Sequence, residues 1–174
     1  NAKSEHKPET PEHFGKINSL VFKNVSFQHK SAKQPAVENI DFSIKQGETV
    51  AFVGPSGSGK TTLVKLLVGL YQPAIGNVLY NGIDSKSIDM LELRQQLGFV
   101  TQDAQLFSGT IRENLLFVKP EATDEEVLNA LHRASCDNLL ARAENGLDST
   151  IGEGGIKISG GEKQRLSIAR AILR

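Results

Sequence analysis

Apolar side chains recur with two different spacings along this chain of 174 residues, and the change falls near residue 102. Before it, residues 20–22 form a short apolar run, residues 25–27 place Val25 and Phe27 on either side of Ser26, and residues 40–44 alternate apolar with polar side chains. An alternation with a period of two is typical of a strand that buries one face. These three segments therefore predict an antiparallel sheet that is covered on one side.

Two further apolar runs predict additional strands. Residues 48–53 are almost continuously apolar, as in a parallel strand that is buried on both faces, and residues 97–101 predict another strand that ends at Gln102. Residues 78–80 precede Asn81-Gly82, a dipeptide that favours a tight hairpin turn. The first part of the chain is therefore predicted to consist mainly of strands.

Helical spacing occurs once before residue 102, at residues 63–70, and dominates the chain beyond it. Apolar positions three and four residues apart predict helices at residues 63–70, 110–117, 123–134 and 158–173. Two of these helices begin with a hydroxyl residue that is followed three positions later by glutamate. This is the pattern of a capping box, and it pairs Thr123 with Glu126 and Ser159 with Glu162. The second half is therefore predicted to be mostly helical.

Composition narrows the class of protein. Lysine plus arginine number 20 and aspartate plus glutamate number 20, so the net charge gives no overall attraction to nucleic acid or to an anionic membrane. No apolar run reaches the roughly 18 residues that span a bilayer, and no secretory signal opens the chain. Cys136, the single cysteine, cannot form an internal disulfide, and we expect it to be a small buried residue. Residues 1–16 have the composition of a linker, in which Asn1-Ala2 resembles the remnant of a cleaved tag.

One glycine-rich loop carries the first candidate chemistry. Between an apolar strand and a helix, it matches the phosphate-binding pattern G-x-x-x-x-G-K-[ST] with Gly54, Pro55, Ser56, Gly57, Ser58, Gly59, Lys60, Thr61 and Thr62. Glycines let the backbone aim successive N–H groups at phosphate oxygens, and the helix start attracts the same anion. Lys60 would bring a cation to the β- and γ-phosphates, and the Thr61 hydroxyl would bind Mg²⁺, which prefers hard oxygen ligands. The alternative is a glycine-rich surface loop, which the flanking strand and helix disfavour.

A second helix start is open to anions. Two glycines in its first turn leave backbone N–H groups sterically accessible, and the residues concerned are Ser159, Gly160, Gly161 and Glu162. A helix start contributes about 0.3 to 1 kcal/mol toward a nearby negative charge. From this physics alone, an ordinary glycine-rich helix start is the more frequent explanation.

Taken together, these motifs resemble the ATP-binding domain of an ABC transporter. Their order is that of the family: the phosphate-binding loop, then Gln102 at the end of a strand, then a signature that usually reads Leu-Ser-Gly-Gly-Gln and here reads Ile-Ser-Gly-Gly-Glu. Residues 106–114 and 151–155 resemble the exporter branch, although Gly154 stands where a basic residue is common. The resemblance covers nearly everything from residue 17 to residue 174.

The resemblance implies an α/β fold, a P-loop NTPase core with an antiparallel β-subdomain and a helical subdomain. We expect tag remnant and linker at 1–16, the β-subdomain and P-loop core at 17–102, and the helical subdomain through the signature helix at 103–174. No apolar run ending in Asp-Glu follows the P-loop, and the family's later histidine has no counterpart in the sequence. We therefore expect a longer domain, cut before the Walker B strand. Without those groups, the 174 residues should bind ATP far better than they hydrolyse it.

The resemblance also assigns roles to single residues, with ATP and Mg²⁺ as the cofactors. Lys60 and Gln102 are implied in catalysis, and Thr61 and Gln102 in binding the metal. His29 stands where the family usually has an aromatic residue beside adenine; an imidazole offers less face than tyrosine, so weaker or pH-sensitive adenine binding is expected. The residues implied to contact ATP that is held by another copy are Ser159, Gly160, Gly161 and Glu162.

The implied partners are a second nucleotide-binding domain, arranged head to tail, and the transmembrane domains of an exporter, with no nucleic acid. The implied location is the cytoplasmic face of the membrane, as part of an integral transporter. A competing hypothesis is an ABC-type ATPase without transport that acts on ribosomes or DNA. Zero net charge and residues 106–114 favour the exporter over it. Two further hypotheses are a P-loop kinase or GTPase, for which the signature helix would be coincidence, and a nonhydrolytic nucleotide sensor.

Overall fold

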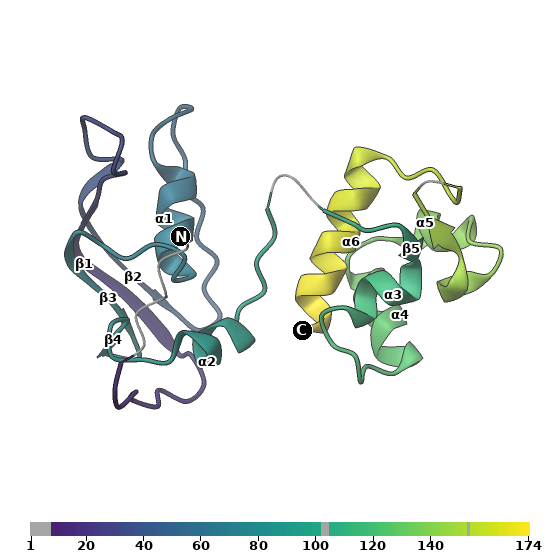
Figure 1. Cartoon of the computed structure of the whole chain (residues 1–174), viewed down its shortest axis with the longest axis horizontal. Coiled ribbons are helices and arrows are strands. Elements are labelled where there is room, and N and C mark those ends of the chain that lie inside the picture. Colours follow the sequence, from purple (N-terminus) through teal and green to yellow (C-terminus); the bar gives the residue numbers. More distant parts are fainter. Residues whose placement is uncertain (1–7, 102–104, 153) are drawn as a thin grey trace. The chain divides into compact units, whose positions relative to one another are not determined.

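The computed structural model describes residues 8–101, 105–152 and 154–174. The chain divides into two compact units, Asn1–Gln96 and Leu97–Arg174 (Figure 1). The expected tag remnant at Asn1-Ala2 and the glutamine Gln102 lie outside the described residues.

The first unit is built on an antiparallel sheet, as the alternation of apolar residues predicts. Its strand order is β2-β1-β3-β4. In this sheet Phe22 lies opposite Phe42 on one side and Val78 on the other, and the two phenylalanine rings stack 4.4 Å apart. The Asn81-Gly82 turn is confirmed, with positive φ at both residues, 51° and 85°. The strands are β1 (Ser19–Phe27), β2 (Val37–Lys45), β3 (Ile75–Tyr80) and β4 (Ile83–Asp84).

The described residues of the first unit also form two helices, α1 (Lys60–Leu67) and α2 (Met90–Gln95). The Tyr80 hydroxyl donates a 2.5 Å hydrogen bond to the carbonyl of Leu67, which joins β3 to the end of α1, and burial raises the pKa of that hydroxyl. Phe14, within the segment expected to be a linker, is buried with its ring 6.2 Å from that of Tyr80. The packed part of this unit therefore includes Phe14.

The strand prediction is wrong for two segments. Neither residues 48–53 nor residues 97–101 form a strand, and Val53, expected to be buried on both sides, is 93% exposed. A strand exists only as part of a hydrogen-bonded ladder. Within the described ranges, no segment pairs with either of these two runs. Their apolar sequence alone does not make them strands.

The second unit is mostly helical, as predicted. Helices α4 and α6 pack against each other and bury Leu131, Leu166 and Ala169 completely. Cys136 is 2% exposed in the same core, and burial raises the pKa of its thiol to about 11, so this side chain is a neutral packing residue. The elements are β5 (Gly109–Thr110), α3 (Ile111–Leu116), α4 (Asp124–Arg133), α5 (Asp137–Ala141), the short 3₁₀ turn Gly146–Asp148, β6 (Thr150–Ile151) and α6 (Gly160–Leu173).

Candidate nucleotide-binding site

The glycine-rich loop leads directly into α1. Gly59 occupies the position before the helix with φ of 86°, and no side chain caps the helix start. The first N–H groups of a helix have no acceptor within the helix, so here they stay available to an incoming ligand. Residues 54–58 are exposed. The loop therefore presents backbone donors at an open surface, as the sequence motif predicts.

Lys60 folds back over this loop. Its ammonium donates hydrogen bonds to the carbonyl of Gly54 at 2.8 Å, to the carbonyl of Pro55 at 2.7 Å and to the Ser58 hydroxyl at 3.3 Å. All three acceptors are neutral, so they orient the ammonium without neutralising its charge. A phosphate group that approached the loop would meet an ordered, uncompensated cation.

The loop is fixed against the start of β2. A β-carbon added to Gly59 would lie 2.4 Å from the carbonyl oxygen of Ala36 and 2.6 Å from the Val37 side chain. No side chain fits there, and the positive φ favours glycine independently. The loop therefore depends on glycine at this position for its close approach to the sheet.

Two adjacent threonines at the start of α1 differ in exposure. Thr61 is exposed, whereas Thr62 is 8% exposed and packs inward. The exposed hydroxyl has the oxygen chemistry that Mg²⁺ prefers. In the described part of the chain, no group of three histidine, cysteine, aspartate or glutamate side chains could hold a metal. A magnesium ion at Thr61 would therefore need further ligands of another kind, such as phosphate oxygens.

His29 belongs to an aromatic cluster beside this loop. Its ring meets Phe27 edge to face at 4.9 Å and Tyr71 edge to face at 5.5 Å, and those two rings stack 4.8 Å apart. Phe27 lies opposite Val37, the residue that contacts Gly59. The structure thus brings His29 and the phosphate-binding loop to the same end of the sheet, and it shows His29 held by two rings.

The start of α6 has the predicted capping box. The Ser159 backbone N–H donates to Glu162 Oε2 at 2.8 Å, and the Glu162 N–H donates to the Ser159 hydroxyl at 3.3 Å. A side chain at Gly160 would meet nothing within 4 Å, and one at Gly161 only a side-chain atom of Arg165 at 3.5 Å. The first turn of α6 is therefore rigidly capped and open to solvent.

Glu162 also forms an ion pair with Arg142, the residue that ends α5. The hydrogen bond from the Ser159 backbone N–H, followed by those from the Ser159 hydroxyl and Arg142, lowers the pKa of this carboxyl below its ordinary value. Glu162 is consequently ionised at neutral pH. The sequence motifs do not include Arg142, because nothing in its local pattern marks a residue that pairs 20 positions away.

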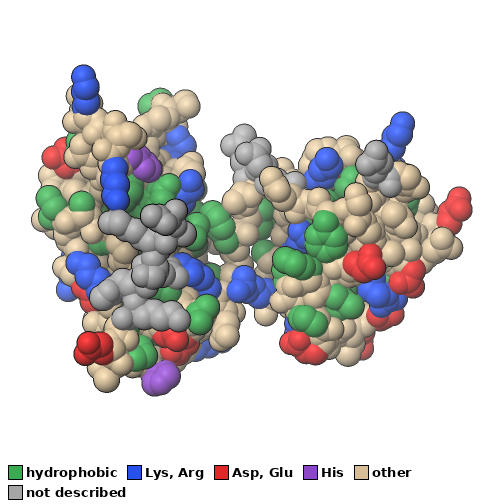
Figure 2. All heavy atoms as spheres, viewed as in Figure 1, with side chains coloured by type: hydrophobic (Ala, Val, Ile, Leu, Met, Phe, Trp, Pro, Cys, Tyr) green, Lys and Arg blue, Asp and Glu red, His purple; other side chains and the backbone are tan. Residues whose placement is uncertain are grey.

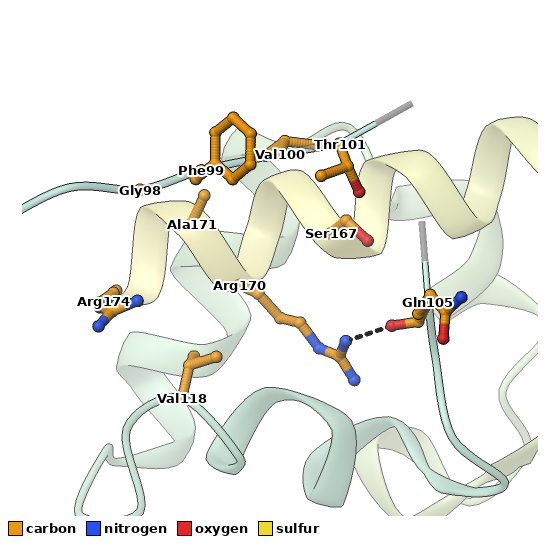
Figure 3. Close-up of a pocket in the computed structure, with 10 residues that line it drawn as sticks. All are labelled: Gly98, Phe99, Val100, Thr101, Gln105, Val118, Ser167, Arg170, Ala171 and Arg174. Atoms are coloured by element: carbon orange, nitrogen blue, oxygen red, sulfur yellow. Dashed lines mark hydrogen bonds between the residues drawn. The ribbon is translucent and has the colours of Figure 1, made fainter. Parts of the chain in front are cut away.

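Arg170 is likewise outside the sequence motifs, and it holds the segment that follows Gln102. Its guanidinium donates to the carbonyls of Gln105 and Asn114, both at 2.7 Å. Arg170 and Gln105 both line a cavity of about 220 Å³, and Figure 3 shows the hydrogen bond between them. Residues 98–101 and the C-terminal half of α6 line this cavity. The sequence pattern of α6 indicates which apolar residues face the core, but it gives no signal for the contacts of Arg170.

The two segments that resemble exporters lie next to each other. Gly109 of β5 pairs with Ile151 of β6, and Thr110 pairs with Thr150. Beside them Phe107 and Phe117 are 41% and 73% exposed, with their rings 5.5 Å apart. Glu153 of the second segment lies outside the described residues.

Two wider properties bear on partners. Basic and acidic side chains are interspersed on the face shown in Figure 2, without a continuous basic surface in that view. Across residues 8–101, 105–152 and 154–174, no helix has both the length and the apolar character needed to cross a bilayer.

Comparisons with known proteins agree with this geometry. The family described as "ABC transporter" matches residues 37–174. The ATP-dependent lipid A-core flippase of Methylobacillus flagellatus is 44% identical over 157 residues, which cover 90% of this chain and 27% of the flippase. ABC transporter B family member 13 of Arabidopsis thaliana is 42% identical over 155 residues, which cover 89% of this chain and 12% of that protein.

A solved structure extends the similarity to three dimensions. The structure of a bacterial Atm1-family ABC exporter with ATP bound superposes with a TM-score of 0.86 at 37% sequence identity, over 97% of this chain and 29% of that one. The chain thus spans between 12% and 29% of the length of these three proteins. Because the family match covers most of the chain and includes both the phosphate-binding loop and the capped glycine helix, the chain belongs to the ABC transporter family.

Proposed function

We propose that this chain is the ATP-binding portion of an ABC exporter, in which ATP binding and hydrolysis drive transport across a membrane. The observation that carries the proposal is the phosphate-binding loop: an uncapped start of α1 with Lys60 held over it by neutral oxygens. Backbone donors and an uncompensated cation at one exposed site suit a polyphosphate.

Within the proposed site, each side chain has a separate task. Lys60 would bind the β- and γ-phosphates, His29 would pack on adenine, and Thr61 with Gln102 would hold Mg²⁺. The metal, when bound, would neutralise phosphate charge and orient the nucleotide.

The start of α6 would complete the site of a second nucleotide-binding domain. Its exposed first turn offers N–H groups at Gly160 and Gly161, with Ser159 and Glu162 fixed by the capping box. Two domains arranged head to tail would then enclose two ATP molecules. Closure would pull on attached membrane domains because the closed state binds ATP more tightly than the open state.

The paired strands β5 and β6, with Phe107 and Phe117 exposed beside them, are the proposed contact with transmembrane domains at the cytoplasmic face of the membrane. The relatives are named as a flippase, a transporter and an exporter, which supports transport over an ATPase that acts on ribosomes or DNA.

ATP titration tests the proposal. We expect Lys60→Ala to weaken binding of labelled ATP with Mg²⁺ by about tenfold or more, because it removes a charged donor to phosphate. Lys86→Ala, an exposed lysine of the same unit, is the matched control and should bind as the wild type does. Equal affinity in Lys60→Ala and the wild type would refute the assignment of the loop.

A further inference from the structure

An arginine from outside the signature motif compensates a buried charge within it. The Glu162 side chain is 11% exposed, and its Oε1 contacts Arg142, whose side chain is 50% exposed. The other oxygen, Oε2, accepts from the Ser159 backbone N–H at 2.8 Å and from the Ser159 hydroxyl at 2.9 Å. Both carboxylate oxygens are therefore occupied, one by a capping box and one by a cation.

This ion pair changes the charge at the start of α6. A helix N-terminus carries about +0.5 elementary charge. An ionised Glu162 alone would outweigh that and leave the first turn negative, which opposes an approaching phosphate. The guanidinium of Arg142 cancels the carboxylate, so the N–H groups of Gly160 and Gly161 keep a positive end.

Arg142 is well placed for this task because it also contacts its own helix. Its Nε donates to the Asn138 carbonyl at 3.3 Å, which orients the guanidinium toward α6. Arg165 lies near the same helix start, with Nη1 3.5 Å from the position of a β-carbon on Gly161. Among the ion pairs of the described residues, however, Glu162 is paired with Arg142.

We propose that Arg142 is a positioning residue for the second nucleotide contact: it neutralises Glu162 and holds the capping box so that the first turn of α6 can accept a phosphate. This inference rests on the proposed function, in which that turn closes on ATP held by another domain. In this role Arg142 would act without contact to the nucleotide. Its effect passes through Glu162.

A double-mutant cycle in the intact protein tests the inference. The measurement is the concentration of a nonhydrolysable ATP analogue, with Mg²⁺, that gives half-maximal pairing of the ATP-binding domains, followed by fluorescence energy transfer. We expect Arg142→Ala to raise this concentration about tenfold when Glu162 is present and less than about twofold in a Glu162→Gln background. The increase caused by Arg142→Ala should also be smaller at high ionic strength, because salt screens the interaction between charges. Arg133→Ala, an exposed arginine on α4, is the matched control.

The outcomes separate charge compensation from a structural role. If Arg142 only holds α5 against α6, its removal should raise the half-maximal concentration by the same factor with Glu162 and with Glu162→Gln. That result would overturn the inference. An unchanged half-maximal concentration in Arg142→Ala would overturn it as well. A wild type that binds the analogue but never pairs would instead refute the proposed closure by a second domain, and the inference with it. Thermal melting of each variant without nucleotide shows whether it is folded.

Discussion

Lys60 and Glu162 illustrate two ways of holding a charged side chain at a site for anions. Lys60 is oriented by the carbonyls of Gly54 and Pro55, which are neutral and can be exchanged for phosphate oxygens. Glu162 is held by a cation, Arg142, in a partly buried pair, and removal of one member of such a pair leaves a costly unpaired charge. The first arrangement suits a ligand that displaces the internal partners, and the second suits a permanent part of the scaffold.

His29 offers a test at the same scale. Because the Phe27 and Tyr71 rings already hold its imidazole in place, a larger ring at position 29 would add stacking area for adenine. We expect His29→Tyr to tighten ATP binding by about two- to tenfold and His29→Ala to weaken it by a similar factor. Isothermal titration calorimetry measures both affinities, and His13→Ala, an exposed histidine of the same unit, serves as control. ATP affinities that do not respond to either change at position 29 would place adenine elsewhere.

At the scale of elements, features set by nearby residues were predictable and features set by distant partners were not. The capping boxes at Thr123 and Ser159 are confirmed because each involves residues three positions apart. The strands expected at 48–53 and 97–101 are absent, because a strand needs a partner that the local pattern does not supply. Arg142 and Arg170 were missed for the same reason, since each acts on residues far along the sequence.

Arg170 should be important for the stability of the second unit. Its guanidinium binds two backbone carbonyls and the side chain of the fully buried Asn114, so Arg170→Ala would leave several polar groups unpaired. We expect a loss of about 2 to 4 kcal/mol in the free energy of unfolding, measured by urea denaturation.

Arg174→Ala is the matched control for this prediction. Arg174 lines the same cavity and stands one helical turn further along, but its side chain is exposed (Figure 3). Its removal should change stability by less than about 0.5 kcal/mol. Equal effects of the two substitutions would show that the contacts of Arg170 are not what stabilises this unit.

For the molecule as a whole, the family was predictable from the order of three motifs along the chain. The phosphate-binding loop and the glycine helix start are individually short patterns, but together, with Gln102 between them, they indicated the family that the comparisons show. The loop lies in the first unit and the glycine helix start in the second. Under the proposed function, each chain supplies two different nucleotide contacts, and these act on different ATP molecules.

Pairing of the intact protein at increasing ATP concentrations tests this proposal in the variant Gly160→Asp. A β-carbon on Gly160 would meet nothing within 4 Å, so aspartate places a negative charge where phosphate would bind and leaves the capping box of Ser159 and Glu162 intact. Gly160→Asn has nearly the same shape without the charge and is the matched control. We predict that Gly160→Asp binds ATP as the wild type does but needs about tenfold more nucleotide to pair than Gly160→Asn, because like charges then meet. Normal pairing in Gly160→Asp, or an equal defect in both variants, would show that the start of α6 does not meet a phosphate through its charge.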